Sequence, residues 1–468
     1  MNFLLLLAAL AGSIWLAIFV LRGSLLAGGV LFVLIASCFG FEFTHFDLGP
    51  VPLTLDRLFL LVLGGMYIVQ RRLGRTQPKP LDRLDLMILV FVALVTASTF
   101  THDWHASPNN DVVPLWRLIA GYWVPLTIYW IARQAPLTER NVRFVHVVLA
   151  GFGVYLAITG ILEITHQWWL VFPKQIADPK LGLHFGRARG PMLHAATFGL
   201  CLTIGLMAML SCLPRAGRRG RLAMLLSLPL FAASIYFSYT RTVWLGGILS
   251  LMIVSWMALS GARRVMLLGG VATVCLLVGM TRWDQIVALK RDSSAADTKT
   301  STVMRASFTY VSWKMFLDRP LWGCGFGHFP SVKRDYLSDR TTSLPLEAIW
   351  QEAHHNTFLS LLTETGIFGM LLFIGILGSW VRAAWRLWYD RSLPDWMRWH
   401  GLLVLGSLGA YGFSLLFFEL TYSPVDNAII FFLTGICAGL SSLAGHTRPV
   451  HLAGIASRRS HAGQASHA

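Results

Sequence analysis

Long apolar runs separated by short polar stretches extend along nearly the whole chain. Most runs approach or exceed the ~20 residues of α-helix that cross a bilayer, so the pattern predicts about 12–13 membrane-spanning helices. The run at 57–70 is short and is expected to tilt or to begin near Leu53. The runs lie at 2–22, 24–41, 57–70, 84–101, 113–132, 142–163, 192–213, 221–237, 242–260, 263–281, 356–381, 399–420 and 426–444.

Basic residues gather in alternate loops between these runs. Cytoplasmic loops of membrane proteins carry an excess of Lys and Arg, so we place these loops inside the cell. The amino terminus then lies outside, the carboxyl terminus lies inside, and the long loops 164–191 and 282–355 lie outside. The clusters are Arg71, Arg72, Arg75, Lys79 and Arg83; Arg133, Arg140 and Arg143; Arg215, Arg218, Arg219 and Arg221; Arg263 and Arg264; Arg382, Arg386, Arg391 and Arg398.

The loops and runs divide the chain into four parts. Residues 1–281 form a bundle of the first ten candidate spans. Residues 282–355 form a periplasmic loop, in which the apolar residues of Val303–Leu317 recur at near-helical spacing and predict a surface helix along the membrane. Residues 356–444 supply the last spans, and the polar tail at 445–468 is predicted to be disordered in the cytoplasm. The first run lacks a basic start and a cleavage site, so we read it as a membrane helix.

Composition supports the membrane assignment and excludes other classes. Hydrophobic residues make up 55% of the chain and charged residues 13%, whereas soluble proteins have about 25% charged residues. The net charge of +16 does not indicate nucleic acid, because the basic residues follow the loops. The six cysteines have neither zinc-site nor disulfide spacing, and we expect them to pack as small apolar side chains.

The first candidate site is His354-His355-Asn356, at the end of the long outer loop. A neutral imidazole can take a proton from a sugar hydroxyl near neutral pH. Gly366 and Gly369 follow one helical turn apart and would let another helix approach closely. The alternative is that these polar residues only cap the start of the 356–381 helix.

The second candidate is a group of arginines near the outer surface. Arg187, Arg189 and Arg241 lie where the charge pattern leaves few basic residues, and ionisable groups that face a bundle interior are usually functional. A guanidinium binds two phosphate oxygens at once, which suits a pyrophosphate. The alternative is that each arginine extends along the membrane interface.

Other polar clusters give weaker evidence for a functional site. The glycine-rich stretch 323–328 lacks the Lys-Ser/Thr pair of a phosphate-binding loop and is predicted to be a turn. His102 and His105 are too few ligands for a metal. Glu163, Glu364 and Glu419 are each able to orient a base, and the sequence does not choose among them. No motif for a nucleotide, metal or other cofactor is present, so none is expected.

Four stretches in order resemble the O-antigen ligase and polymerase superfamily. His355-Asn356, nine residues, then Gly366-Ile367-Phe368-Gly369 is similar to the signature of its ligases. The outer loop before the histidine also fits. The other stretches are Arg187-Ala188-Arg189-Gly190-Pro191-Met192 with His194 and Phe198; Ser238-Tyr239-Thr240-Arg241; and Arg305 followed by 318–327.

The resemblance implies an all-helical bundle with a periplasmic loop, related to lipid-dependent membrane glycosyltransferases, and a metal-independent, inverting transfer. The donor would be a glycan on undecaprenyl pyrophosphate, and the acceptor lipid A-core oligosaccharide or another surface glycan, at the periplasmic face of the inner membrane. His355 would be the base, and Asn356 would orient or bind. Arg187, Arg189, Arg241 and Arg305 would bind the pyrophosphate. Ala195-Ala196 replaces a Pro-Asn pair frequent in the family, so His194 receives no role.

Three functions remain open at this point. The first is a ligase that joins a lipid-linked glycan to a different acceptor, as in lipopolysaccharide biosynthesis. The second is a polymerase of the same superfamily, which extends the lipid-linked glycan itself. The third is a polysaccharide transporter or flippase, which the sequence favours least because no Gly/Pro-broken helices recur in matching halves.

Overall fold

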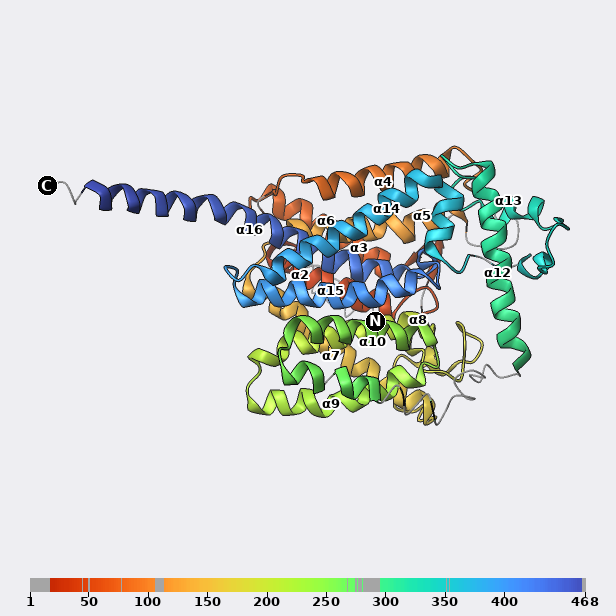
Figure 1. The fold of residues 1–468 in the computed structure, drawn as a ribbon, viewed down its shortest axis with the longest axis horizontal. Coiled ribbons are helices and arrows are strands. Elements are labelled where there is room, and N and C mark those ends of the chain that lie inside the picture. The colour runs from red at the N-terminus through yellow and green to blue at the C-terminus, as the bar shows by residue number, and fades with distance from the viewer. Residues whose placement is uncertain are drawn as a thin grey trace, which may run out of the picture.

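The computed structural model describes residues 17–464 except 44, 49, 50, 77, 106–112, 267, 274, 275, 277–279, 281–294, 351 and 353. Within these ranges the protein is a helical bundle, with one antiparallel hairpin of β1 (His45–Leu48) and β2 (Val51–Thr54). Most helices run side by side along the long axis of Figure 1, and α12 crosses one end of them. The prediction of an all-α polytopic membrane protein is confirmed.

The helices alternate in direction along the chain. A broken helix follows α4: it consists of α5 (Pro114–Leu118), the π-helical turn η1 (Ile119–Trp123) and α6 (Val124–Gln134). The longer helices are α2 (Leu25–Cys38), α3 (Leu55–Arg72), α4 (Arg83–Phe100), α7 (Glu139–Ile164), α8 (Ala195–Cys212), α9 (Arg218–Phe237), α10 (Arg241–Ala258), α12 (Ala295–Asp318), α14 (Thr357–Tyr389), α15 (Asp395–Leu415) and α16 (Pro424–Gln464). Short helices are η2 (Lys174–Ala177), η3 (Gly190–Met192), η4 (Leu213–Arg215), α13 (Phe329–Val332), η5 (Lys333–Tyr336), η6 (Leu346–Ile349) and η7 (Leu420–Tyr422).

Seven helices of the described ranges are long and apolar enough to cross a bilayer. They are α4, α7, α8 with η4, α9, α10, α14, and α16 as far as Gly445. The shorter α2 matches the run predicted at 24–41, α3 and α15 match 57–70 and 399–420, and the broken helix matches 113–132. The run at 2–22 lies mostly, and the run at 263–281 partly, outside the described residues, so the total number of spans stays a prediction.

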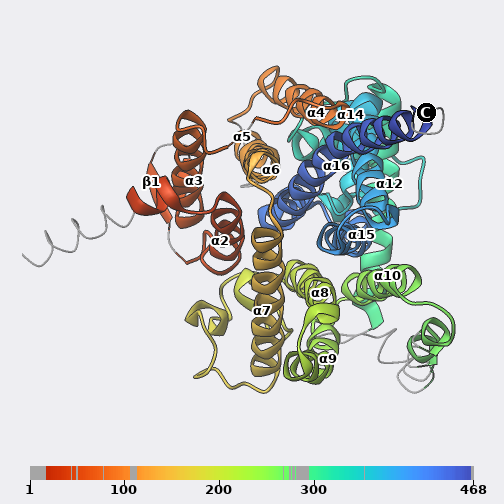
Figure 2. The ribbon, with the colours of Figure 1, turned by 90° about the vertical axis from the view of Figure 1, so that its left-hand side faces the viewer.

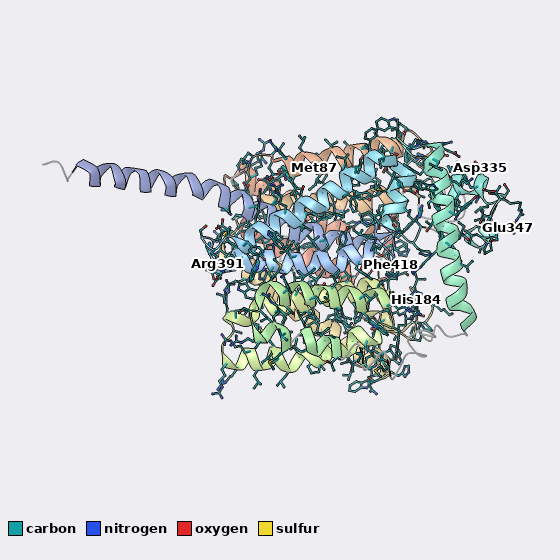
Figure 3. All side chains as sticks on the ribbon, in the orientation of Figure 1. Met87, His184, Asp335, Glu347, Arg391 and Phe418 are labelled. Atoms are coloured by element: carbon teal, nitrogen blue, oxygen red, sulfur yellow. The ribbon has the colours of Figure 1, made fainter. Side chains whose placement is uncertain are left out.

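The two ends of the bundle differ in their chemistry. Figure 3 shows Arg391 at one end, and His184, Asp335, Glu347 and Phe418 at the other. We call these the basic end and the loop end. At the basic end Arg133 lies 2.5 Å from Asp85 across α6 and α4. Asp85 also completes the reciprocal cap with Asp82 that begins α4.

Helix α16 packs against α6, α14, α15 and α2, and lies among the bundle helices in Figure 2. Its first turn, with Asp426 and Asn427 buried, lies at the loop end. The helix continues to Gln464, beyond the bundle in Figure 1. The structure therefore differs from the predicted disordered tail, which was expected from residue 445; residues 465–468 lie outside the described ranges.

The long loop before α14 has a small core of its own. Phe308, Val311 and Met315 of α12 are buried against Cys324, Phe329 and neighbouring loop residues. The predicted helix at 303–317 is confirmed, and it is longer than expected. The buried face differs in one respect, because Trp313 is 52% exposed although its spacing matched the apolar stripe. The polar start of this loop, 282–294, lies outside the described residues.

Helix α14 is kinked at Gly366, where the loop docks onto it. The backbone of Gly366 has φ 67° and ψ −166°, a region that is essentially restricted to glycine. The kink lets Ile367 N–H donate to Pro320 O at 2.9 Å, and Cys324 N–H donate to Thr363 O at 2.8 Å. The predicted turn at 323–328 is confirmed, and Gly323, Gly325 and Gly327 all have positive φ. The sequence predicted that another helix approaches this glycine pair. At Gly366 the approaching segment is the outer loop, at Leu321, and Gly369 faces Leu94 of α4.

Gly366→Ala is expected to lower the free energy of unfolding by at least about 2 kcal/mol, since the backbone becomes strained and a Cβ would collide with the Leu321 carbonyl. The measurement is the thermal unfolding midpoint of the purified protein in detergent. Gly378→Ala on the same helix is the matched control, because no atom lies within 4 Å of its added Cβ. Equal midpoints for the two variants would contradict this account of the kink.

Candidate functional site

A cavity of about 1180 Å³ opens at the loop end of the bundle. Its wall comes from α2, α3, α6, α8, α10, α12, α15 and α16 and from the loops between them, including those before α8 and α14. Ligand sites of this size are usually mostly apolar, with a few converging polar groups. The apolar part of this wall includes Phe32, Val124, Leu245, Phe417, Val425 and Ala428.

The polar part of the wall is formed by charged side chains from distant parts of the chain. Arg187, Arg241 and Arg305, all predicted from the sequence to bind pyrophosphate, line this cavity together with His355. Arg305 projects from α12, and its guanidinium lies 5.3 Å from the Phe417 ring centroid. The fold thus brings four predicted site residues to one space. Arg57, His184, His194, Glu352, Glu419 and Tyr422 also line it.

His355 is the more exposed of the two adjacent histidines. Its ring meets the Phe308 ring edge-on at 5.4 Å. Its Nε2 atom lies 3.7 Å from Glu352 Oε2, and about 45% of the side chain is exposed. A carboxylate at this distance stabilises the imidazolium form that a base acquires when it accepts a proton.

His354 belongs to the wall behind it. Its ring centroid lies 3.6 Å from that of Phe329. Its Nε2 faces Thr363 Oγ1 at 3.1 Å. Burial lowers the pKa of His354 well below its usual value, and nearby Arg117 lowers it further. His354 also lines the cavity but is only 4% exposed, so it is neutral and packed, and His355 is the more accessible residue of the pair.

Asn356 caps α14 and does not line the cavity. Its Oδ1 accepts from Leu359 N–H, and its Nδ2 donates to Leu416 O, both at 2.9 Å. The side chain therefore fixes the first turn of α14 to the end of α15. From the sequence, a helix cap and a catalytic site were alternative explanations of the His-Asn pair. In the structure Asn356 is the cap, and it fixes the backbone that carries His355 at the cavity.

Arg189 lies behind the cavity wall rather than on it. The side chain is 1% exposed, and its guanidinium donates to the carbonyls of Leu181, Ile176 and Asp178. Its backbone N–H and that of Gly190 donate to the Glu163 carboxylate, at 3.2 and 2.8 Å. Its position favours a structural role, in which Arg189 shapes the loop that presents Arg187.

A buried network beneath the site was missed by the sequence reasoning. Arg117 of α5 is 2% exposed and lies 2.7 Å from Glu364 and 3.2 Å from Glu419. Its remaining donors bind Ser360 Oγ at 2.8 Å and Thr421 Oγ1 at 2.7 Å. Three segments far apart in the sequence are joined at this one guanidinium. The available signal was an arginine inside the apolar run 113–132, which is functional by default in a membrane helix.

The π-helical turn η1 lies next to the Arg117 network, which forms the floor of the cavity. It leaves the Gly121 carbonyl to accept from Asn427 Nδ2 at 3.0 Å, and Asn427 Oδ1 accepts from Tyr411 at 2.8 Å. Gly121 has no side chain where Thr421 packs against it. Such π-turns often mark functional sites, and this one lets α16 and η7 approach Arg117 closely.

The remaining clusters do not form a metal centre. No group of three or more His, Cys, Asp or Glu side chains is arranged to hold a metal ion within the described ranges. His102 lies with its ring 5.1 Å from that of His328. The five described cysteines, Cys38, Cys201, Cys212, Cys324 and Cys437, form no disulfide, and Cys275 lies outside the described residues.

The fold and cavity define a multi-pass membrane protein with a polar and apolar site at one end of its bundle. A family model described as O-antigen ligase matches residues 222–374, which include Arg241, Arg305, His355 and Gly366. This part of the chain is similar to the O-antigen ligase family, which supports a glycan-transfer function of the ligase or polymerase type. No curated protein matches the chain.

Proposed function

We propose that this protein is a ligase that transfers a glycan from undecaprenyl pyrophosphate to lipid A-core oligosaccharide or another surface glycan. The observation that carries the proposal is the convergence of His355 with Arg187, Arg241 and Arg305 on one cavity. The apolar part of the wall suits the lipid carrier, and the arginines suit its pyrophosphate. The site would face the periplasm from the inner membrane, since the basic clusters lie at the opposite end.

The reaction needs one base and one anion site. His355 would take the proton of the acceptor hydroxyl while its oxygen forms a bond to the anomeric carbon of the glycan. The bond from that carbon to the pyrophosphate oxygen breaks, and the electron pair leaves with the pyrophosphate. Attack from the face opposite the leaving group inverts the anomeric centre. Arg187, Arg241 and Arg305 would stabilise the charge on the leaving group, so no metal ion is required.

Two predicted residues take revised roles in this proposal. Arg189 and Asn356 are positioning residues: the first shapes the loop of Arg187, and the second caps the helix behind His355. Gly366 permits the loop that carries Arg305 to dock beside α14. In such a site the reacting side chains are held in position by rigid neighbouring residues. Group transfer depends on this fixed geometry.

Deletion of the gene tests the proposal against a polymerase. A cell without the ligase is expected to accumulate full-length carrier-linked chains, because polymerisation continues and attachment stops. The measurement is the length and attachment of surface glycans, with extraction of the carrier-linked fraction. Single repeat units on the carrier would show a polymerase instead, and loss of surface glycans with accumulation of carrier-linked glycan on the cytoplasmic leaflet would indicate a flippase.

Arg241→Lys and Arg305→Lys are each expected to reduce transfer by about 10- to 100-fold, because a point charge cannot form the bidentate contact of a guanidinium. The loss should appear mainly as weaker donor binding, measured with carrier-linked glycan extracted from the deletion strain. Arg340→Lys is the matched control, since Arg340 lies in the same outer loop and its exposed pair with Glu347 is outside the cavity. Unchanged binding and rate in both cavity variants would remove them from the pyrophosphate site.

A further inference from the structure

His194 forms part of the cavity wall at the start of α8. It is the residue immediately before the helix, and its ring meets the Phe418 ring edge-on at 5.9 Å. Its Nδ1 lies 3.0 Å from Thr197 Oγ1. Burial lowers the pKa of His194 to about 4, and nearby His184 acts in the same direction. The imidazole is therefore neutral, with one protonated and one unprotonated nitrogen.

Thr197 connects this histidine to a carboxyl group on another helix. The Thr197 hydroxyl donates to Asp426 Oδ2 at 3.1 Å, across 229 residues of sequence. Both side chains are at least 97% buried. Asp426 lies in the first turn of α16. Asp426 Oδ1 is buried and receives no hydrogen bond from the described residues.

The chain of contacts determines which nitrogen of His194 carries the proton. A hydroxyl has one proton, and in Thr197 that proton is directed to Asp426. The hydroxyl oxygen must then accept from His194, so Nδ1 carries the hydrogen. The Thr197 backbone N–H also points at Nδ1, but at 3.5 Å it lies at the limit of a hydrogen bond. The 3.0 Å contact decides the tautomer, and Nε2 keeps its lone pair.

We propose that His194, oriented by Thr197 and Asp426, is a second functional histidine of the cavity and accepts a hydrogen bond from a substrate hydroxyl through Nε2. His194 lines the cavity and its Nδ1 contacts Thr197, so Nε2 is the ring nitrogen left for a ligand. A neutral acceptor binds O–H or N–H groups and repels phosphate oxygens, which are acceptors themselves. His194 thus selects the sugar part of the substrate, whereas the arginines select its pyrophosphate.

This assignment rests on the proposed function for the identity of the hydroxyl, but not for the tautomer. His194 is a positioning residue for a sugar, and no proton leaves it during transfer. Its orientation depends on Thr197 of α8 and Asp426 of α16, whereas Arg241 lies on α10, Arg305 on α12 and His355 before α14. The prediction of the His194 tautomer and the proposed transfer reaction can therefore be tested separately, and one can be wrong without the other.

The tautomer is measured by ¹⁵N NMR of the full-length protein in nanodiscs, labelled at histidine, with the His194 signals identified by their loss in His194→Phe. We expect a protonated Nδ1 and an unprotonated Nε2 in the wild type and in Thr197→Ser, which keeps the hydroxyl. Thr197→Val leaves the backbone N–H as the contact of Nδ1, so the proton should move to Nε2. A protonated Nε2 in the wild type, or no change in Thr197→Val, would overturn the proposal.

The hydroxyl contact is measured by transfer kinetics with carrier-linked glycan from the deletion strain. His194→Phe should raise KM for the donor or acceptor by about fivefold or more, with kcat nearly unchanged. His194→Gln, whose amide oxygen reaches the position of Nε2, should recover part of this loss. A purely structural role predicts a lower unfolding midpoint in both variants without a change in KM. Unchanged KM in His194→Phe rejects the contact, and absence of transfer in the wild type rejects the proposed function alone.

Discussion

Replacement of His355 by alanine is expected to slow glycan transfer by about 10²–10⁴-fold, the usual contribution of a positioned general base. Binding of the carrier-linked donor should persist, because the arginines that line the cavity come from α10, α12 and the loop before α8. The measurement is single-turnover transfer in proteoliposomes, with donor affinity determined separately. The separation of rate from affinity distinguishes a base from a binding residue.

His105→Ala is the matched control for this variant, since His105 is an exposed outer-loop histidine that does not line the cavity. His355→Gln supplies a second comparison, because the amide keeps a hydrogen bond but cannot accept a proton at neutral pH. Retained turnover in His355→Ala would remove the assignment of the base. Loss of donor affinity with a normal rate of transfer would make His355 a binding residue.

The location of His355 was predictable because its determinants are local. A polar pair immediately before an apolar run begins a helix, and the alternation of basic loops assigns an end of the bundle. The same local rules predicted the helix at 303–317 and the turn at 323–328. They erred at one position of α12, Trp313, which is exposed because the loop core of Phe329, Leu337 and Ile349 packs on the neighbouring side of the helix.

The difference between Arg187 and Arg189 could not be predicted in the same way. The two residues lie two positions apart on an irregular loop, where no helical or strand period assigns a face. Their directions are set by Glu163, which binds two backbone N–H groups of this loop from α7. The Arg117 network is a stronger example, since its partners lie 243–304 residues away. No pattern within one segment encodes such pairs.

Arg117→Met should be the most destabilising substitution in the site. It leaves the carboxylates of Glu364 and Glu419 buried without their cation, a change that typically costs about 3–5 kcal/mol. Three hydrogen bonds and an ion pair of Arg117 hold α5, α14 and η7 together, so the floor of the cavity should loosen with the loss of stability. The measurement is the unfolding midpoint in detergent and the yield of folded protein, compared with wild type.

Arg143→Met is the matched control, because Arg143 of a predicted basic cluster pairs with Glu139 at 3.7 Å with both side chains about half exposed, where such pairs contribute only about 0–1 kcal/mol. The combined change Arg117→Met with Glu364→Gln and Glu419→Gln removes the charges together, and it should recover much of the stability lost in the single variant. A stable Arg117→Met protein would show that the carboxyl groups are protonated without the arginine.

The triple variant also separates folding from chemistry. If the network only holds the fold, recovered stability should restore transfer. If it also fixes the turn that presents His355, the triple variant should fold but transfer slowly, since neutral amides hold Ser360 and Thr421 less firmly than the guanidinium does. We expect the second result, because Ser360 lies one helical turn from the Asn356 cap and donates to Glu364 on the same face of α14. The stability of the floor and the position of the base are then consequences of one buried charge.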